Sequence, residues 1–123
     1  MARLLLVDDD PTGLELRKLI LERQGHQVTV ALDAASARRA FSQIQPDSVM
    51  LDLRLPESAD GLALIREFRA AAPRLHIVVL SGYTPDLDGK PEASMVDRLL
   101  AKPAPTALLV SAVAACPTAP VSE

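Results

Sequence analysis

Short apolar runs alternate with segments of helical periodicity along most of the chain. The run Leu4–Val7 is apolar without interruption, which is typical of a strand buried on both faces of a sheet. Four further runs predict strands, at 27–31, 48–51, 76–80 and 98–101. The first of these, 27–31, alternates between apolar and polar residues as an edge strand does. Because strand and helix alternate five times, the pattern predicts a parallel sheet with right-handed crossovers and helices on both faces.

Capping residues and breakers place the helices between these strands. Asp10 is suited to cap a first helix with Pro11 at its first position, and Asp33 to cap a second. We expect a third helix to open at Gly61 and to stop before Pro73. The apolar positions with helical spacing in the first, second, third and last helices are Leu16, Leu19 and Ile20; Ala37, Ala40, Phe41 and Ile44; Leu62, Ile65, Phe68 and Ala72; and Leu109, Val110 and Val113.

Length and composition limit the class of protein. The chain has 123 residues, 49% hydrophobic, enough for one domain, which we place at 1–116, with 117–123 as a flexible tail or the start of a linker. A net charge of -3 and an aromatic content of 2% argue against nucleic-acid binding. The lone Cys116 excludes an internal disulfide, and no Cys/His set has zinc spacing. No apolar run approaches the roughly 18 residues of a membrane helix, so we expect a cytoplasmic protein without membrane contact.

Reactive side chains follow four of the five predicted strands. Asp8 and Asp9 follow the first, Asp52 the third, Ser81 the fourth and Lys102 the fifth. The carboxyl ends of parallel strands form the usual ligand site of an open α/β sheet. Three carboxylates gathered there would repel one another unless a cation joins them, and an all-oxygen site with water positions suits Mg²⁺. The constellation predicts Mg²⁺-dependent phosphoryl transfer onto an aspartate.

Simpler interpretations exist for each of these residues taken alone. The acids at 8–10 could cap the first helix, but one acid suffices, and we assign that part to Asp10. Ser81-Gly82 marks many turns, and Lys102-Pro103 is equally weak by itself. The Arg17-Lys18 pair indicates an ordinary solvated helix face.

Taken together, five segments resemble the receiver (CheY-like) domain of two-component response regulators: LLLVDDDP at 4–11, VMLDLRLP at 49–56, DG at 60–61, VVLSGY at 78–83 and LAKP at 100–103. The resemblance covers nearly the whole chain. It implies a flavodoxin-like, doubly wound sheet of five parallel strands in the order 2-1-3-4-5 with five helices. It also implies a signalling module, not an enzyme, which takes a phosphoryl group from a histidine kinase or histidine phosphotransfer protein and then changes its binding to a downstream protein target, unknown here.

The same resemblance assigns the metal site and the acceptor. Asp52 would be the phospho-acceptor and would also contact Mg²⁺. Asp9 would bind the ion directly, Asp8 mostly through water, and the backbone carbonyl of Arg54 would complete the protein ligands.

The same resemblance assigns roles to four side chains. Ser81 would supply the hydroxyl that moves to the phosphoryl group, and Lys102 its charged partner, with a cis bond expected before Pro103. The side chains of Arg54 and Tyr83 occupy positions similar to those that tune the rate of dephosphorylation in relatives.

The chain departs from the family pattern in its last third. Residues 83–96 hold Pro85, Gly89 and Pro91 without an apolar period, so we expect the family's fourth helix to be short, displaced or absent. Leu99 replaces the aromatic residue that changes rotamer on activation in relatives. One extra residue also lengthens the loop between Pro56 and the Asp60-Gly61 pair.

Two rival functions and one question of context stay open. Asp8, Asp10 and Thr12 resemble the opening motif of haloacid-dehalogenase-like phosphatases, with Asp8 as the nucleophile, but no acid lies between Lys102 and Glu123 to complete that metal site. A flavin-binding flavodoxin would need a phosphate loop after the first strand, which is missing. The sequence fits either a stand-alone regulator or a receiver cut from a longer protein such as a hybrid kinase.

Overall fold

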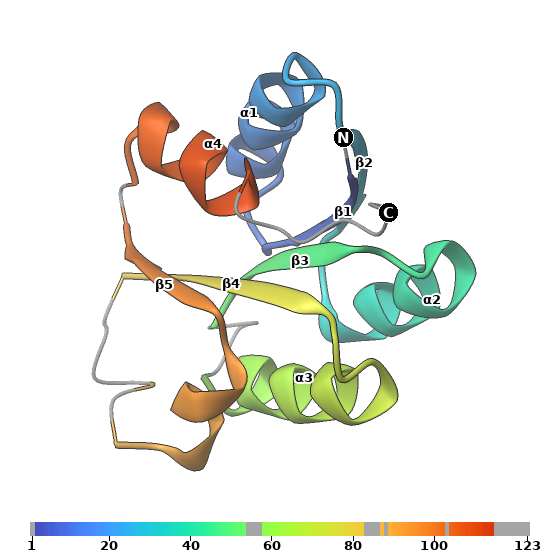
Figure 1. The fold of residues 1–123 in the computed structure, drawn as a ribbon, viewed down its shortest axis with the longest axis vertical. Helices are drawn as coiled ribbons and strands as arrows, with labels where there is room; N and C mark the ends of the chain where they lie inside the picture. Colours follow the sequence, from blue (N-terminus) through green and yellow to red (C-terminus); the bar gives the residue numbers. More distant parts are fainter. Residues whose placement is uncertain (1, 54–57, 83–86, 88, 103, 115–123) are drawn as a thin grey trace.

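Five parallel strands form one sheet with helices on both sides (Figure 1). The computed structural model describes residues 2–53, 58–82, 87, 89–102 and 104–114. The strand order is β2-β1-β3-β4-β5, as the sequence predicted. In chain order the elements are β1 (Arg3–Val7), α1 (Pro11–Glu22), β2 (Gln27–Ala31), α2 (Ala34–Ile44), β3 (Ser48–Asp52), α3 (Ser58–Ala71), β4 (His76–Ser81), the 3-10 helix η2 (Pro91–Met95), β5 (Arg98–Ala101) and α4 (Thr106–Ala114).

Several expectations fall on residues outside this description. They are the metal-ligating carbonyl of Arg54, the rate-tuning side chains of Arg54 and Tyr83, the peptide bond before Pro103, and the tail at 117–123.

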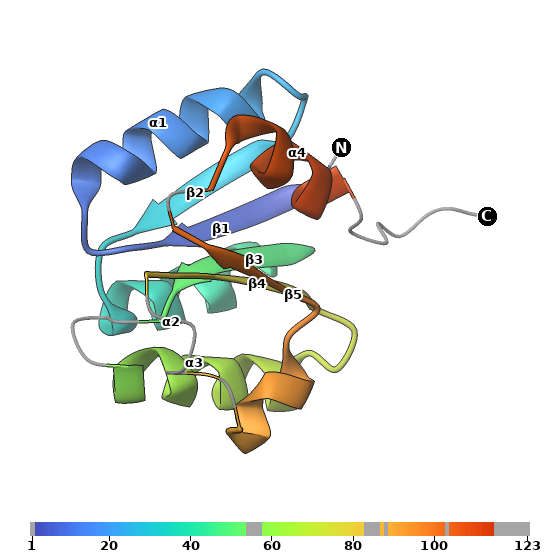
Figure 2. The same ribbon diagram turned by 90° about the vertical axis from the view of Figure 1, so that its left-hand side faces the viewer.

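The sheet has a hydrophobic core on each face, because every strand projects side chains alternately to both sides. Helices α1 and α4 cover one face and α2 and α3 the other (Figure 2). On the first face Leu4, Leu6 and Met50 of the strands pack with Leu14 and Leu21 of α1 and with Leu109 and Val113 of α4. On the second face Leu5, Val49 and Ile77 pack with Ala37 and Ala40 of α2 and Ile65 and Phe68 of α3. Two covered faces explain the apolar runs without alternation.

The starts of α1 and α2 follow local hydrogen-bonding chemistry. Asp10 caps α1 by accepting a hydrogen bond from the Thr12 backbone N–H at 3.2 Å, and Asp33 caps α2 through Ser36 at 2.7 Å, as predicted. Helix α3 begins at Ser58, so the prediction that it opens at Gly61 was wrong by three residues. A packing contact accounts for the glycine: a Cβ there would lie 2.0 Å from the carbonyl oxygen of Leu53.

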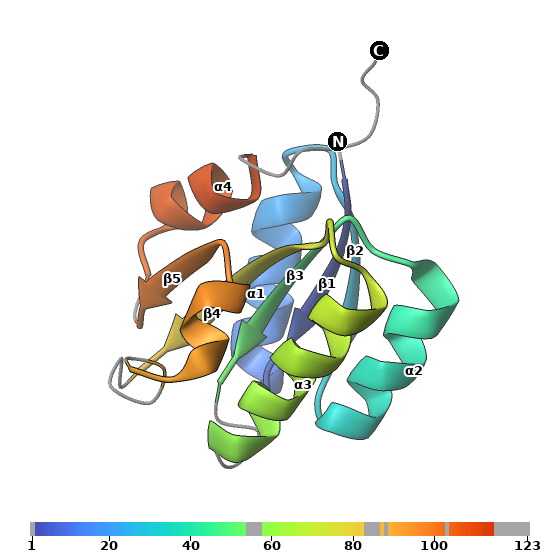
Figure 3. The same ribbon diagram turned by 60° about the horizontal axis from the view of Figure 1, so that its bottom comes forward.

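Between β4 and β5 the described residues contain the five-residue helix η2 and no α-helix, which confirms the expected loss of a regular fourth helix. Helix η2 lies beside α3 (Figure 3). Arg66 of α3 forms an ion pair with the buried Glu92 of η2, and Arg69 donates to the Met95 carbonyl oxygen at 2.6 Å and 3.0 Å. Leu87, which precedes η2 in the chain, is also buried in the core on the α2 and α3 face of the sheet. The prolines disfavour a long helix in this segment, and Arg66 and Arg69 hold the short helix η2 that forms instead.

Candidate functional site

Three carboxylates meet at the carboxyl ends of β1 and β3. Asp8, Asp9 and Asp52, here called the acidic cluster, each offer an oxygen within 4.8 Å of the others. The register explains the meeting: Val7 is the strand partner of Leu51, so the residues that follow each lie at the same level of the sheet. Asp8 is 2% exposed and Asp52 9%, whereas Asp9 is exposed. The structure therefore brings together the three carboxylates that the sequence predicted to converge.

A lysine that follows the edge strand β5 bridges two members of the acidic cluster. Lys102 Nζ donates to Asp52 Oδ2 at 2.8 Å and to Asp8 Oδ2 at 3.0 Å. The lysine follows β5, and its backbone N–H donates to the Ser81 carbonyl oxygen at 2.9 Å. The ends of β1, β3 and β5 therefore contribute side chains to one site, and Ser81, 2% exposed at the end of β4, contacts Lys102 through its backbone carbonyl.

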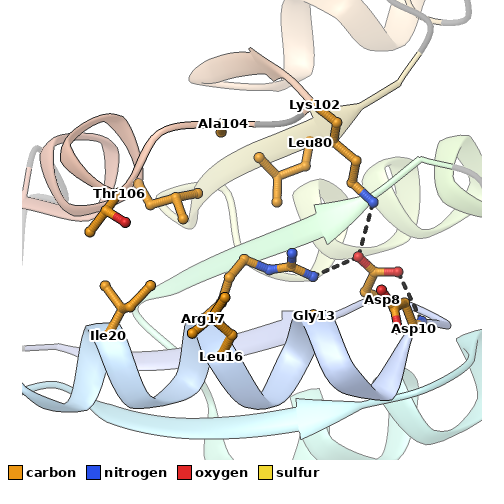
Figure 4. A pocket seen from close by; sticks show the side chains of 11 residues that line it. Asp8, Asp10, Gly13, Leu16, Arg17, Ile20, Leu80, Lys102, Ala104 and Thr106 are labelled. Atoms are coloured by element: carbon orange, nitrogen blue, oxygen red, sulfur yellow. Dashed lines mark hydrogen bonds and ion pairs between the residues drawn. The ribbon is translucent and has the colours of Figure 1, made fainter.

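Asp8 has a second cationic partner that sequence reasoning missed. Arg17 of α1 donates from Nη2 to Asp8 Oδ2 at 2.6 Å, and its side chain is only 15% exposed, not solvated as predicted (Figure 4). The backbone N–H of Asp10 donates to Asp8 Oδ1 at 3.1 Å. Arg17 is three residues after Leu14 and four before Leu21, but this spacing indicates burial only once the structure shows that Leu14 and Leu21 face the sheet.

Charge and burial act in opposite directions on the two ionisable groups at the centre. Burial raises the pKa of Asp8, but hydrogen bonds from Lys102 and from the Asp10 backbone, with the charges of Lys102 and Arg17, outweigh it and lower the pKa overall. Burial lowers the pKa of Lys102, and hydrogen bonds to Asp52 and Asp8 outweigh it, so that this pKa is raised. Both groups are therefore charged at neutral pH.

A groove of about 490 Å³ opens beside this site, between α1 and α4 (Figure 4). Asp8, Arg17 and Lys102 lie at its charged end. Its remaining wall is mostly apolar and includes Leu16, Ile20, Leu80, Ala104 and Leu109. The groove thus reaches Asp8 of the acidic cluster, and its wall has both an apolar and a charged part.

The acidic cluster has the chemistry of a hard-cation site. Its donors are all carboxylate oxygens, which Mg²⁺ prefers, and Asp9 is exposed on its solvent side. Three carboxylates carry one negative charge more than Lys102 and Arg17 compensate. The residues present therefore fit a divalent ion.

Across the residues that the structure describes, no helix combines the length and apolar character needed to cross a membrane.

Comparison with known proteins identifies the family. The family of the response regulator receiver domain matches residues 4–114. The chain is 36% identical over 97 residues to the transcriptional regulatory protein TrcR of Mycobacterium tuberculosis, covering 79% of this chain and 34% of TrcR. It is 38% identical over 80 residues to the regulator RpaA of Synechocystis, covering 65% and 33%. The chain thus spans about a third of the length of these relatives.

Solved structures agree with the sequence comparison. A CheY-like receiver domain from Methylobacillus flagellatus superposes with a TM-score of 0.83 at 31% identity, over 94% of this chain and 98% of that one. The response regulator TrrA of Thermotoga maritima, solved in complex with Mg²⁺-BeF, gives 0.83 at 27% identity, over 93% and 97%. With its motifs, its strand order and its convergent acids, the chain belongs to the response regulator receiver domain family.

Proposed function

We propose that this receiver domain accepts a phosphoryl group on Asp52 from a histidine kinase or a histidine phosphotransfer protein, with the help of Mg²⁺, in the cytoplasm. The observation that carries the proposal is the convergence of Asp8, Asp9 and Asp52 within 4.8 Å, with Lys102 joined to two of them. The relatives are signalling proteins of this family, and a receiver is a signalling module.

The reaction is a displacement at phosphorus. A carboxylate oxygen of Asp52 would form the new P–O bond while the bond from phosphorus to the donor's histidine nitrogen breaks, giving an acyl phosphate. The product histidine takes up a proton. Asp52 is suited to this because it lies at the end of β3 and is 9% exposed, whereas Asp8 is 2% exposed and one of its oxygens, Oδ2, accepts from both Lys102 and Arg17.

Mg²⁺ would be held by Asp8, Asp9 and Asp52, with the carbonyl of Arg54 proposed by resemblance, and would supply positive charge beside the incoming phosphoryl oxygens. Lys102 would exchange its contact with Asp52 Oδ2 for a phosphoryl oxygen, since an ammonium on a flexible stem can follow the added charge. Ser81, at the end of β4, would donate its hydroxyl to another phosphoryl oxygen. We also propose that Arg54 and Tyr83 tune the lifetime of the acyl phosphate.

The outcome of phosphorylation would be altered binding to a protein target, without nucleic-acid contact by this domain. The relatives include transcriptional regulators, but their names describe proteins about three times as long as this chain. The phosphatase alternative with Asp8 as nucleophile is not favoured, because the family match includes Asp52 and the acid at position 8 is enclosed by two cations.

Phosphorylation by a small acyl phosphate donor with Mg²⁺ tests the proposal directly. Intact-mass measurement should show one added phosphoryl group on the wild type and none on Asp52→Asn, because the amide is not a nucleophile of this kind. Borohydride reduction of the acyl phosphate followed by peptide mapping should locate the modification at position 52. Modification found at Asp8, or retained in the Asp52→Asn protein, would contradict the proposal and favour the phosphatase alternative.

A further inference from the structure

Arg17 is a cation at the acidic cluster to which the receiver motifs assign no part. It comes from the middle of α1, two helical turns after the cap residue Asp10, and reaches back along the helix to the carboxyl end of β1. Its Nη2 atom lies 2.6 Å from Asp8 Oδ2. This contact is shorter than the 3.0 Å contact that Lys102 makes with the same oxygen.

One carboxylate oxygen therefore has two positively charged neighbours. Asp8 is 2% exposed, and the rest of its carboxylate is used as well, since Oδ1 accepts the Asp10 backbone N–H. A charge buried to this extent needs compensation, and two cations provide more of it than the ion pair with Lys102 alone. The same two cations oppose the approach of a third.

We propose that Arg17 is an internal competitor of Mg²⁺, so that it stabilises the metal-free acidic cluster and weakens the affinity of the cluster for the ion. This inference rests on the proposed Mg²⁺ binding by Asp8, Asp9 and Asp52. A unit charge and a double charge a few ångströms apart repel appreciably even in a medium of high dielectric constant. Loading of the site therefore requires the guanidinium to leave Asp8 or to remain beside the ion at a cost.

The groove gives the guanidinium a place to go. Arg17 lines the cleft of about 490 Å³ between α1 and α4, which extends from Asp8 toward Thr106 (Figure 4). An arginine has a long, flexible stem that packs on apolar walls while its head stays hydrated. The walls offered here include Ile20 and Leu109. Arg17 can therefore exchange its ion pair for a position in the groove without any change in the backbone of α1.

The test compares Arg17→Gln with a matched control, Arg38→Gln. Arg38 also forms an ion pair, with Glu67 at 2.7 Å, but it lies between α2 and α3 on the opposite face of the sheet. Both variants lose one positive charge. Mg²⁺ binding is measured by calorimetric titration at fixed ionic strength, and thermal unfolding is followed with and without Mg²⁺.

We expect Arg17→Gln to bind Mg²⁺ about tenfold more tightly than the wild type, as charge repulsion of this kind predicts. Its melting temperature should be lower without the ion, and the increase on adding Mg²⁺ should be larger. The Mg²⁺ affinity of Arg17→Lys should lie between those of the wild type and Arg17→Gln. Arg38→Gln should bind Mg²⁺ as the wild type does. A purely structural arginine would lower the melting temperature without tightening Mg²⁺ binding.

The outcomes separate this inference from the function on which it rests. Equal or weaker Mg²⁺ affinity in Arg17→Gln, with the wild type binding measurably, overturns the role of Arg17 and leaves the proposed function intact. The same holds if Arg38→Gln tightens binding to the same degree, because net charge would then be the cause. Absence of binding in all four proteins overturns both proposals.

Discussion

At the scale of single residues, Lys102 connects the acidic cluster to the backbone of the sheet. Its ammonium contacts Asp52 and Asp8, which come from two different strands, while its own backbone N–H is bonded to β4 through Ser81. The lysine is therefore fixed at one end and adaptable at the other. This arrangement suits a cation that must stay at the site while the charge in front of it changes from a carboxylate to an acyl phosphate.

A second titratable residue, His76, makes the stability of the protein depend on pH at the opposite end of the sheet. It is buried at the start of β4, and its Nδ1 lies 3.0 Å from Ser48 Oγ. Burial lowers its pKa, the charge of Asp97 raises it, and Arg98 and Arg69 lower it further, with a net decrease. The folded state thus takes up a proton at this site less readily than the unfolded state.

The free energy of unfolding should therefore be largest above about pH 6.5, the ordinary pKa of histidine, and decline as the pH falls through that value toward the lower pKa of the folded state. His76→Asn should flatten this part of the profile, and the part that remains is assigned to His26, whose pKa burial also lowers. Urea denaturation from pH 7.5 to 5.5 measures both profiles. A slope unchanged in the variant would show that His76 is not its source.

At the scale of elements, Gly61 determines how closely α3 can pack against the end of β3. A Cβ at this position would lie 2.0 Å from the Leu53 carbonyl oxygen and 2.7 Å from the Leu53 Cα, both backbone atoms that cannot rotate away. Leu53 itself follows Asp52 directly and is fully buried. The contact therefore connects the helix to the segment that carries the proposed acceptor.

We expect Gly61→Ala to lower the free energy of unfolding by about 3 kcal/mol, at the upper end of what overpacking costs, because the backbone of α3 or β3 must move. Gly82→Ala is the matched control, since a Cβ there meets nothing within 4 Å. Chemical denaturation of both variants measures the difference. If the two variants are equally stable, the close approach of α3 is not a constraint on the fold.

The elements also show what the sequence could and could not predict. Strand positions, both helix caps and the weak fourth-helix region followed from local patterns, because capping and proline effects act within a few residues. The buried face of α1 did not. Leu16 and Leu19 have helical spacing but are exposed, whereas Leu14 and Leu21 face the sheet. That choice depends on how α1 is placed against β1 and α4, which no local pattern encodes.

At the scale of the whole molecule, the site forms because the strands of the sheet are parallel. Asp8, Asp52, Ser81 and Lys102 are separated by 94 positions from first to last and meet only because four parallel strands end at one edge. Their convergence was predictable, because the topology of a parallel sheet follows from the strand–helix alternation. Arg17 was not, because a helix contributes it from the side. Neither does the sequence pattern reveal the groove that this helix forms with α4.

Because the acids meet only in the folded chain, Mg²⁺ binding should stabilise the whole domain. A ligand that binds the folded state alone adds RT ln(1 + [L]/Kd), about 1.4 kcal/mol at ten times Kd, which corresponds to a rise in melting temperature of roughly 3–8 °C for a domain of this size. Calorimetry at increasing Mg²⁺, with NaCl added to equalise ionic strength, measures the shift. Asp9→Asn should abolish most of it, since this exposed acid adds a ligand but little packing. A shift of equal size in Asp9→Asn would mean that the ion binds elsewhere, whereas its loss would show that strand ends brought together by folding form the metal site.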